Sequence, residues 1–309
     1  MNWDESNTTV TRARKTGYGA IDNTRQMGVR RMKGSIITAR TSRVSALAVA
    51  SAFTVAAVVF TTSPASAGSL CLGHVATIVG TAGPDIIHGT PGPDVIAGLG
   101  GDDHIYGGKG PDLICGNDGS DIIAGQRGYD RIAGDHGGDV LQGNRGQDRI
   151  RGGAGDDSIS DGPAHHDRHG NRSDHFSGGA GTDLIVGEAG PDVLSGGAGG
   201  DTIKGGRGGD FIYGSGDDDV ISGGRGPDHL QGGPGDDVIK AGWGADHVSA
   251  GDGADIVKAG LGTDVLRGRS GNDSLNTVDG VSGNDTADGG VGTDTCTTDT
   301  GDATASCEA

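Results

Sequence analysis

Large apolar and aromatic side chains are scarce in this chain. Phe, Trp and Tyr make up 3% of the 309 residues, whereas 65 residues are Gly. This composition is too poor in bulky side chains for an ordinary layered domain built around one core. Unless a regular pattern organises the glycines, it predicts a disordered chain.

Positive charge is scarce once residues 1–67 are set aside. The chain has 24 Lys or Arg and 42 Asp or Glu, and residues 1–67 hold nine of the basic and three of the acidic ones. Residues 68–309 therefore have 15 basic and 39 acidic side chains, a net charge of −24, and all the acidic ones except Glu188 and Glu308 are Asp. Such a surface repels nucleic acid and anionic membranes and attracts cations.

Catalytic signatures are also missing. The sequence contains no H-E-x-x-H, no G-x-S-x-G and no P-loop lysine motif. We therefore expect a protein that is not an enzyme.

The first 67 residues are of a different kind from the rest. A basic run precedes an apolar stretch at 44–60, and the small residues 65–67 follow it. This order predicts a secretory signal peptide over 1–67 and a secreted, extracellular protein that does not insert into a membrane after cleavage. The polar start of this segment is superfluous if translation begins at Met27 or Met32. The alternative is a retained membrane anchor.

All four cysteines follow the predicted cleavage site. An even number of cysteines in an exported chain predicts two disulfides. The simplest pairing is Cys71–Cys115 and Cys296–Cys307. The first bridge requires the segment before Gly80 to fold back along the stack, because its cysteines would otherwise lie far beyond the ~7 Å limit on Cα separation. Other pairings or free thiols are the alternatives.

A strict nonapeptide repeat organises the glycines. Nine units fill residues 80–160 and eleven fill 178–276, and two degenerate units follow at Gly280 and Gly289. Each of these units has Asp at position 6, and the twenty units of the main blocks have Ile, Leu or Val at position 8. We divide the exported chain into a cap with block one (68–160), a His/Asp-rich insertion (161–177), block two (178–276) and a C-terminal cap of degenerate repeats (277–309).

The repeat predicts short strands joined by glycine turns. One apolar residue at position 8, flanked by outward residues at 7 and 9, suits a three-residue strand, and Gly permits the tight turn before it. Two units then form one coil, and the chain is an all-β solenoid with two blocks. Thr77–Val79 is a candidate first capping strand. The sequence leaves open whether the blocks stack as one roll.

The insertion contains several histidines and also a shortened copy of the repeat. Residues 170–177 resemble a unit with one residue deleted, in which Asp174 occupies position 6. His165, His166 and His169 are compatible with a transition-metal site or with a solvated polar loop.

The position-6 aspartates are the candidate metal ligands. Units two apart lie one above the other, so their carboxylates form rows with about 4.8 Å between members. Like charges this close repel unless a cation lies between them. Oxygen ligands in a flexible turn suit Ca²⁺ better than Mg²⁺ or Zn²⁺. The alternative is a metal-free solenoid in which Asp only favours turns.

The motif G-x-x-G-x-D-x-Φ-x resembles the RTX, or haemolysin-type, calcium-binding nonapeptide repeat over about 200 residues. The resemblance implies a right-handed parallel β-roll that holds Ca²⁺ between turns through Asp side chains and turn carbonyls. Asp285 and Asp294 match more weakly. The implied ligands are Asp85, Asp94, Asp103, Asp112, Asp121, Asp130, Asp139, Asp148, Asp157, Asp183, Asp192, Asp201, Asp210, Asp219, Asp228, Asp237, Asp246, Asp255, Asp264 and Asp273.

Two separate blocks would hold at most sixteen ions, one between each pair of stacked units. Some units depart from the repeat. Ala241, Ala250 and Ala259 replace the Gly at position 1, which questions the turn geometry there, and Asp217 replaces the Gly at position 4.

Three functions remain compatible with these features. The first is a secreted, non-enzymatic calcium-binding β-roll whose folding is coupled to Ca²⁺. The second is a calcium-dependent adhesin or module that binds extracellular polysaccharide or a cell surface, to which an exposed Trp243 could contribute. The third is a non-catalytic fragment or relative of an RTX enzyme or cytolysin.

Overall fold

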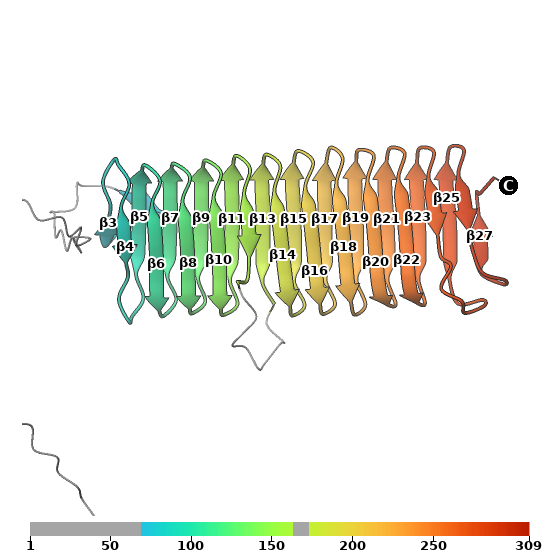
Figure 1. Ribbon diagram of the computed structural model, residues 1–309, viewed down its shortest axis with the longest axis horizontal. Helices are drawn as coiled ribbons and strands as arrows, with labels where there is room; N and C mark the ends of the chain where they lie inside the picture. Colours follow the sequence, from blue (N-terminus) through green and yellow to red (C-terminus); the bar gives the residue numbers. More distant parts are fainter. Residues whose placement is uncertain (1–68, 163–172, 309) are drawn as a thin grey trace, which may run out of the picture. The chain divides into compact units, whose positions relative to one another are not determined.

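The described residues form a roll made of two parallel β-sheets (Figure 1). The structure is a computed structural model and describes residues 69–162 and 173–308. These residues contain strands and turns but no helix. The predicted signal peptide and His165, His166 and His169 lie outside the described residues. No helix among the described residues is long and apolar enough to cross a membrane.

The first sheet has twelve strands, and the chain visits it once per coil. Its strands in chain order are β4 (Ile86–His88), β6 (His104–Lys109), β8 (Ile122–Arg127), β10 (Val140–Arg145), β12 (Ser158–Ser160), β14 (Leu184–Ala189), β16 (Thr202–Arg207), β18 (Val220–Arg225), β20 (Val238–Gly244), β22 (Ile256–Gly262), β24 (Ser274–Asn276) and β26 (Thr295–Thr297).

The second sheet has thirteen strands and forms the opposite face of the roll. Its strands are β3 (Ile78–Val79), β5 (Val95–Gly100), β7 (Leu113–Asp118), β9 (Arg131–His136), β11 (Arg149–Ala154), β13 (His175–Ala180), β15 (Val193–Ala198), β17 (Phe211–Gly216), β19 (His229–Pro234), β21 (His247–Asp252), β23 (Val265–Ser270), β25 (Thr286–Val291) and β27 (Ala303–Ala305).

The two predicted blocks share both sheets and form one continuous roll. Within a block, neighbouring strands are offset by 18 residues, as in the pairing of Ile105 with Ile123. Across the insertion, Ile150 pairs with Phe176 and Ile159 pairs with Ile185. The register continues because residues 173–177 act as the end of a repeat unit, as the phase of Asp174 and Phe176 predicts.

The regular strands are longer than the three residues that we expected. Most run for six residues, over positions 7–9 of one unit and 1–3 of the next. In β8, for example, Ile123 and Gly125 are buried, whereas Ile122 and Arg127 are exposed. The glycines at position 1 therefore point inward like the residues at position 8, and alternation lasts for the whole strand. Sequence patterns of apolar residues miss this second inward position because Gly has no side chain.

Position 2 of the repeat has a left-handed backbone. Its φ angle is 111° at Gly108, but also 78° at Gln126 and 71° at Glu188. Side chains with a Cβ adopt this region at a steric penalty. This explains why Gly is favoured at position 2, and it shows that the turn keeps its geometry where Gln126 and Glu188 replace Gly.

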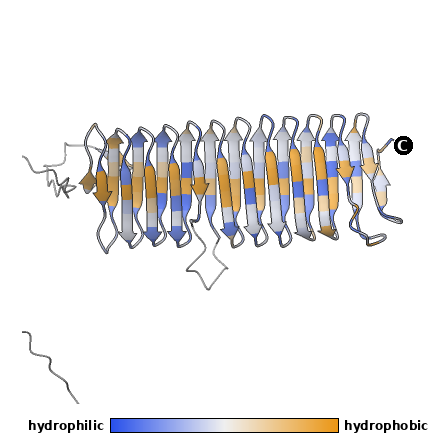
Figure 2. Ribbon diagram, viewed as in Figure 1, coloured by the Kyte–Doolittle hydropathy of each residue, from blue (hydrophilic) through white to orange (hydrophobic). Residues whose placement is uncertain are grey.

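The core is a single file of side chains between the two sheets. The position-8 residues are at most 8% exposed from Ile87 to Leu275, and Phe176 of the interrupted unit joins them at 2%. Hydrophobic colours recur in the middle of successive strands in Figure 2. A core one residue wide buries little apolar surface per residue, and so gives limited hydrophobic stabilisation.

Both predicted disulfides are present. The antiparallel strands β1 (Leu70–Cys71) and β2 (His74–Val75) precede the roll, and Cys71 bonds Cys115 of β7 with a Cα separation of 5.5 Å. The first segment therefore folds back along the stack, as this bridge requires. At the other end, Cys296 of β26 bonds Cys307. The predicted capping strand also forms, because β3 pairs with β5.

Candidate metal centre

The position-6 aspartates form two ladders, one along each edge of the roll. From Asp94 onward they are at most 7% exposed, and only Asp85 is partly accessible. The first ladder precedes the strands of the twelve-stranded sheet and the second those of the thirteen-stranded sheet. The first comprises Asp85, Asp103, Asp121, Asp139, Asp157, Asp183, Asp201, Asp219, Asp237, Asp255, Asp273 and Asp294, and the second Asp94, Asp112, Asp130, Asp148, Asp174, Asp192, Asp210, Asp228, Asp246, Asp264 and Asp285.

Backbone hydrogen bonds fix each carboxylate within its ladder. The amide of Asp103 donates to Oδ1 of Asp121 at 2.8 Å, and the amide of Asp192 donates to Oδ1 of Asp210 at 2.9 Å. The same bond recurs between successive members from Asp85 to Asp294 and from Asp94 to Asp285. Each aspartate is therefore held through Oδ1 by the coil that precedes it, and its other oxygen, Oδ2, takes no part in this hydrogen bond.

The Oδ2 atoms are buried without hydrogen-bond partners. Nineteen ladder aspartates of the described chain have such an atom, among them Asp103, Asp201 and Asp255. The first member of each ladder differs. Oδ2 of Asp85 accepts a hydrogen bond at 2.6 Å from the amide of Thr81, and Oδ2 of Asp94 accepts one at 2.6 Å from the amide of Thr90, four residues earlier in each case. A buried charged oxygen without a partner destabilises a fold by several kcal/mol unless it is protonated or bound to a cation.

Burial raises the pKa of most of the ladder carboxyls. The pKa of Asp103 rises to about 6, that of Asp112 to about 7 and that of Asp192 to about 8. Loss of solvent is the largest cause in each, the backbone hydrogen bond opposes it, and the negative charge of the next aspartate in the ladder adds to it. A nearby cation would reverse this effect by favouring the charged carboxylate.

Backbone carbonyls converge on the same oxygens. A Cβ placed on Gly116 would lie 2.0 Å from Oδ2 of Asp121 and 2.9 Å from the carbonyl oxygen of Gly134. A carboxylate of one coil and a carbonyl of the next therefore meet beside position 1. No three His, Cys, Asp or Glu side chains gather as a ligand group in the described part of the chain. Carboxylate and carbonyl oxygens are the kinds of ligand that suit Ca²⁺.

The units that depart from the repeat keep the ladder. Ala241 and Ala250 are fully buried at position 1, yet Asp246 still donates from its amide to Oδ1 of Asp264 at 2.9 Å. Asp217 takes the left-handed backbone of position 4, with φ 69°. The turn is therefore retained where Gly is missing.

Three ladder aspartates were not among the twenty predicted ligands. Asp174 lies between Asp148 and Asp192 in the second ladder. Its place at position 6 of the shortened unit could have identified it as a ladder residue. Asp285 and Asp294, the weaker matches, are 3% and 0% exposed. Beyond them, the amide of Asp294 donates to Oε2 of Glu308, which no repeat pattern marks.

A comparison with protein families identifies the same repeat in the sequence. The RTX calcium-binding nonapeptide repeat, described as four copies, matches ten segments, some of which overlap: 79–114, 116–147, 134–160, 170–194, 177–212, 195–230, 213–248, 223–257, 241–275 and 276–305. The chain belongs to the RTX calcium-binding nonapeptide repeat family. No curated protein matches it.

The family and the fold agree on the broad character of the protein. RTX repeats bind Ca²⁺, and the β-roll expected from them is the fold observed. This chain is therefore a calcium-binding repeat protein, whose many stacked units provide for several ions. The segment at 170–194 belongs to the matched repeats, in agreement with the place of Asp174 in the second ladder.

Proposed function

We propose that this RTX protein is a secreted, non-enzymatic calcium-binding β-roll whose folding depends on Ca²⁺. The ladder aspartates, including the twenty predicted ones, supply carboxylate ligands, and carbonyls near position 1 supply the rest. The observation that carries this proposal is the set of nineteen buried Oδ2 atoms without hydrogen-bond partners. Calcium neutralises these carboxylates and thereby removes the main electrostatic obstacle to stacking the coils.

The number of ions follows from the ladders and the charge. Sixteen ions was a ceiling for two separate blocks. Twelve aspartates in the first ladder and eleven in the second, each continuous, provide eleven and ten spacings between neighbours. Full occupancy of these 21 spacings would add 42 positive charges, far above the 24 needed to neutralise residues 68–309. We expect about twelve ions at saturation, because binding weakens once the roll is neutral.

Secretion is supported by the disulfides and by the leader-like sequence. Cys71–Cys115 and Cys296–Cys307 join the two ends of the roll to its body, and such bonds persist in oxidising compartments. Extracellular calcium is also abundant enough to fill weak sites. A non-enzymatic role is supported by the extent of the repeats, which account for nearly all of 69–162 and 173–308.

Calorimetry combined with circular dichroism tests the proposal. The full chain, titrated with Ca²⁺ after chelation, should bind about twelve ions and gain strand signal as it does so. Asp201→Asn should reduce the number of bound ions, whereas Asp118→Asn, on a side chain that is 82% exposed, should not. Binding of one ion or none, or an unchanged strand signal with excess chelator, would overturn the proposal.

A further inference from the structure

One outer face of the roll carries a group of cations on an otherwise acidic chain. Over β16 to β22, the twelve-stranded sheet presents the exposed side chains of Lys204, Arg207, Arg225, Lys240 and Lys258. Five of the 15 basic residues after residue 67 therefore lie on four neighbouring strands. Over β15 to β21 of the opposite sheet, the strands contain no Lys or Arg.

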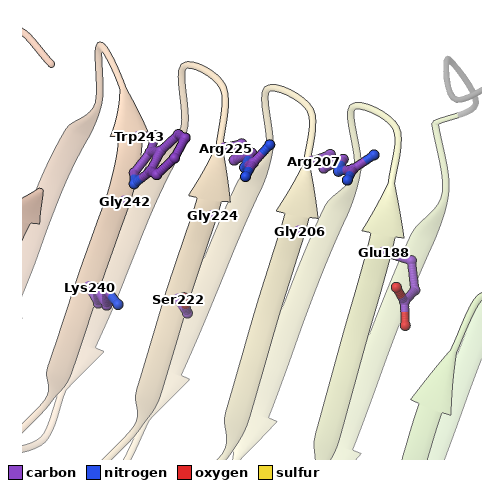
Figure 3. A pocket seen from close by; sticks show the side chains of 9 residues that line it. All are labelled: Glu188, Gly206, Arg207, Ser222, Gly224, Arg225, Lys240, Gly242 and Trp243. Carbon is purple, nitrogen blue, oxygen red and sulfur yellow. The ribbon is translucent and has the colours of Figure 1, made fainter. Parts of the chain in front are cut away.

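Three of these cations, Arg207, Arg225 and Lys240, border a shallow groove that crosses the strands (Figure 3). One wall is the row at position 3, close to the turns, and the other is the row at position 9. The groove encloses about 390 Å³. The floor of the groove consists of Gly206, Gly224 and Gly242. Arg207, Arg225 and Trp243 form the first wall, and Ser222 and Lys240 form the second. Glu188 lies at one end.

The glycine floor and the coil spacing give the groove its direction. Gly206 pairs with Gly224, and Gly224 pairs with Gly242, so the floor is bare backbone along the axis of the roll. Successive members of each wall are one coil apart, about 4.8 Å. An extended chain that lies along this axis would therefore meet a new wall residue on each side at nearly every coil.

The cations of the groove are available to a ligand. Arg225 lies 4.5 Å from the ring centroid of Trp243, a cation–π contact that leaves its charge unneutralised. The ion pairs of His136 with Asp118 and of Arg151 with Asp135 lie on the opposite sheet, and in the described part of the chain no ion pair joins Arg207, Arg225 or Lys240 to a carboxylate. The groove cations therefore have no carboxylate partner.

The neighbouring edge of the roll is also free of surface acids. The turns that follow β16, β18 and β20 begin with Gly208-Gly209, Gly226-Pro227 and Ala245. On the opposite edge, the turns before β18 and β20 carry Asp217, Asp218 and Asp236. Apart from Glu188 at the end of the groove, the surface acids near these strands lie on the far edge, so cations outnumber acids around the groove.

We infer that this groove binds a linear polysaccharide with negatively charged groups at regular intervals, laid along the roll axis. The flat floor accommodates sugar rings, while Arg and Lys on both walls bind carboxylate or sulfate groups. A single nucleic acid strand fits the groove less well, because such strands stack their bases on several aromatic side chains. Trp243 is the one aromatic side chain that lines the groove.

The inference rests on the proposed calcium binding, which would control the affinity. Without Ca²⁺, the net charge of −24 on residues 68–309 repels a polyanion. Calcium binding to the ladder aspartates removes that repulsion, so the groove cations then dominate the electrostatic potential on this face. Polysaccharide binding should therefore appear only as calcium loads and should weaken with added salt.

Binding of polygalacturonate to the calcium-loaded full chain tests the site, with neutral dextran and poly(dT) as competing probes. The variant Arg225→Gln/Lys240→Gln should weaken polygalacturonate binding about tenfold, since it removes one cation from each wall. The matched variant Lys109→Gln/Arg127→Gln removes two cations from β6 and β8 of the same sheet, where Gln126 occupies the floor. It should change binding less than twofold. Equal loss in both variants would overturn the inference.

A second pair of variants changes the groove itself. Ser222→Glu places a negative charge between the walls and should abolish binding, whereas Ser222→Gln should retain most of it. Binding of poly(dT) alone would overturn the inference in favour of a nucleic acid. Calcium titration of the unmodified chain separates the two ideas: normal calcium uptake without polysaccharide binding refutes the groove, and absent calcium uptake refutes the proposed function. Each variant should keep normal calcium uptake, so that its loss of polysaccharide binding reports on the groove alone.

Discussion

When a chelator has removed the calcium, the roll should be folded at pH 5 and unfolded at pH 7.5. Folding raises the pKa of thirteen ladder carboxyls from 3.8 to between about 6 and about 8. The folded state therefore binds more protons than the unfolded state between these values. The free energy of unfolding consequently falls as the pH rises through this range.

The size of the effect follows from a single carboxyl. Raising one pKa from 3.8 to about 6 removes roughly 3 kcal/mol of stability at neutral pH, and we halve this because solvent reaches into a thin roll. Thirteen such groups together outweigh the ~5–15 kcal/mol by which a typical domain is stable. Lowering the pH to 5 removes about half of this penalty, because the unfolded carboxyls are still ionised at pH 5, and calcium removes the penalty at pH 7.5.

Far-ultraviolet circular dichroism of the full chain between pH 8 and pH 5 measures the transition. With excess chelator, strand signal should appear as the pH falls, with a midpoint between pH 6 and 7. With millimolar Ca²⁺, the signal should be present at both ends of the range. Light scattering controls for aggregation. Equal strand signal at pH 5 and pH 7.5 in chelator would refute the reasoning.

Three further predictions concern calcium-loaded protein. Replacing Cys71 with Ser opens a 44-residue loop and should lower the free energy of unfolding by about 4 kcal/mol in guanidinium titrations, against about 3 kcal/mol for Cys307→Ser, whose loop spans 11 residues. Ile203→Ala, at a fully buried site, should lower it by about 2–5 kcal/mol, whereas Ile256→Ala, at a site 55% exposed, should change it by less than 1 kcal/mol. Gly116→Ala should reduce the calcium count measured by calorimetry, because its methyl group would overlap Oδ2 of Asp121; Ala250→Gly, at the same repeat position, should leave the count unchanged.

The sequence predicts the repeating parts of this fold well. The fixed places of Asp and of the apolar residue determine the coil length, the core at position 8 and the stacking of units two apart. Each of these depends on the nearest coils alone. Asp201, for instance, receives its hydrogen bond from Asp183 at 2.8 Å, one coil earlier.

Features that depend on glycine or on irregular segments were harder to predict. The six-residue strands were missed because the inward residue at position 1, such as Gly125, has no apolar side chain to reveal it. Continuity of the roll depended on a single shortened unit, which Phe176 completes with a bulkier side chain than its neighbours. The end of the first ladder was missed because Glu308 lies beyond the repeats and reaches its place through a bridge to Thr295.

The shortened unit around Asp174 also determines to which of the two sheets each later strand belongs. Successive units alternate between the two sheets, so removing one unit would transfer all later strands to the opposite face without disturbing a single repeat motif. Lys240 and Arg225 would then leave the face that holds Lys109 and Arg127, and the acidic turns would change edges. Whole repeat units can therefore be gained or lost without exchanging the two faces only in pairs, that is, in steps of one coil of 18 residues.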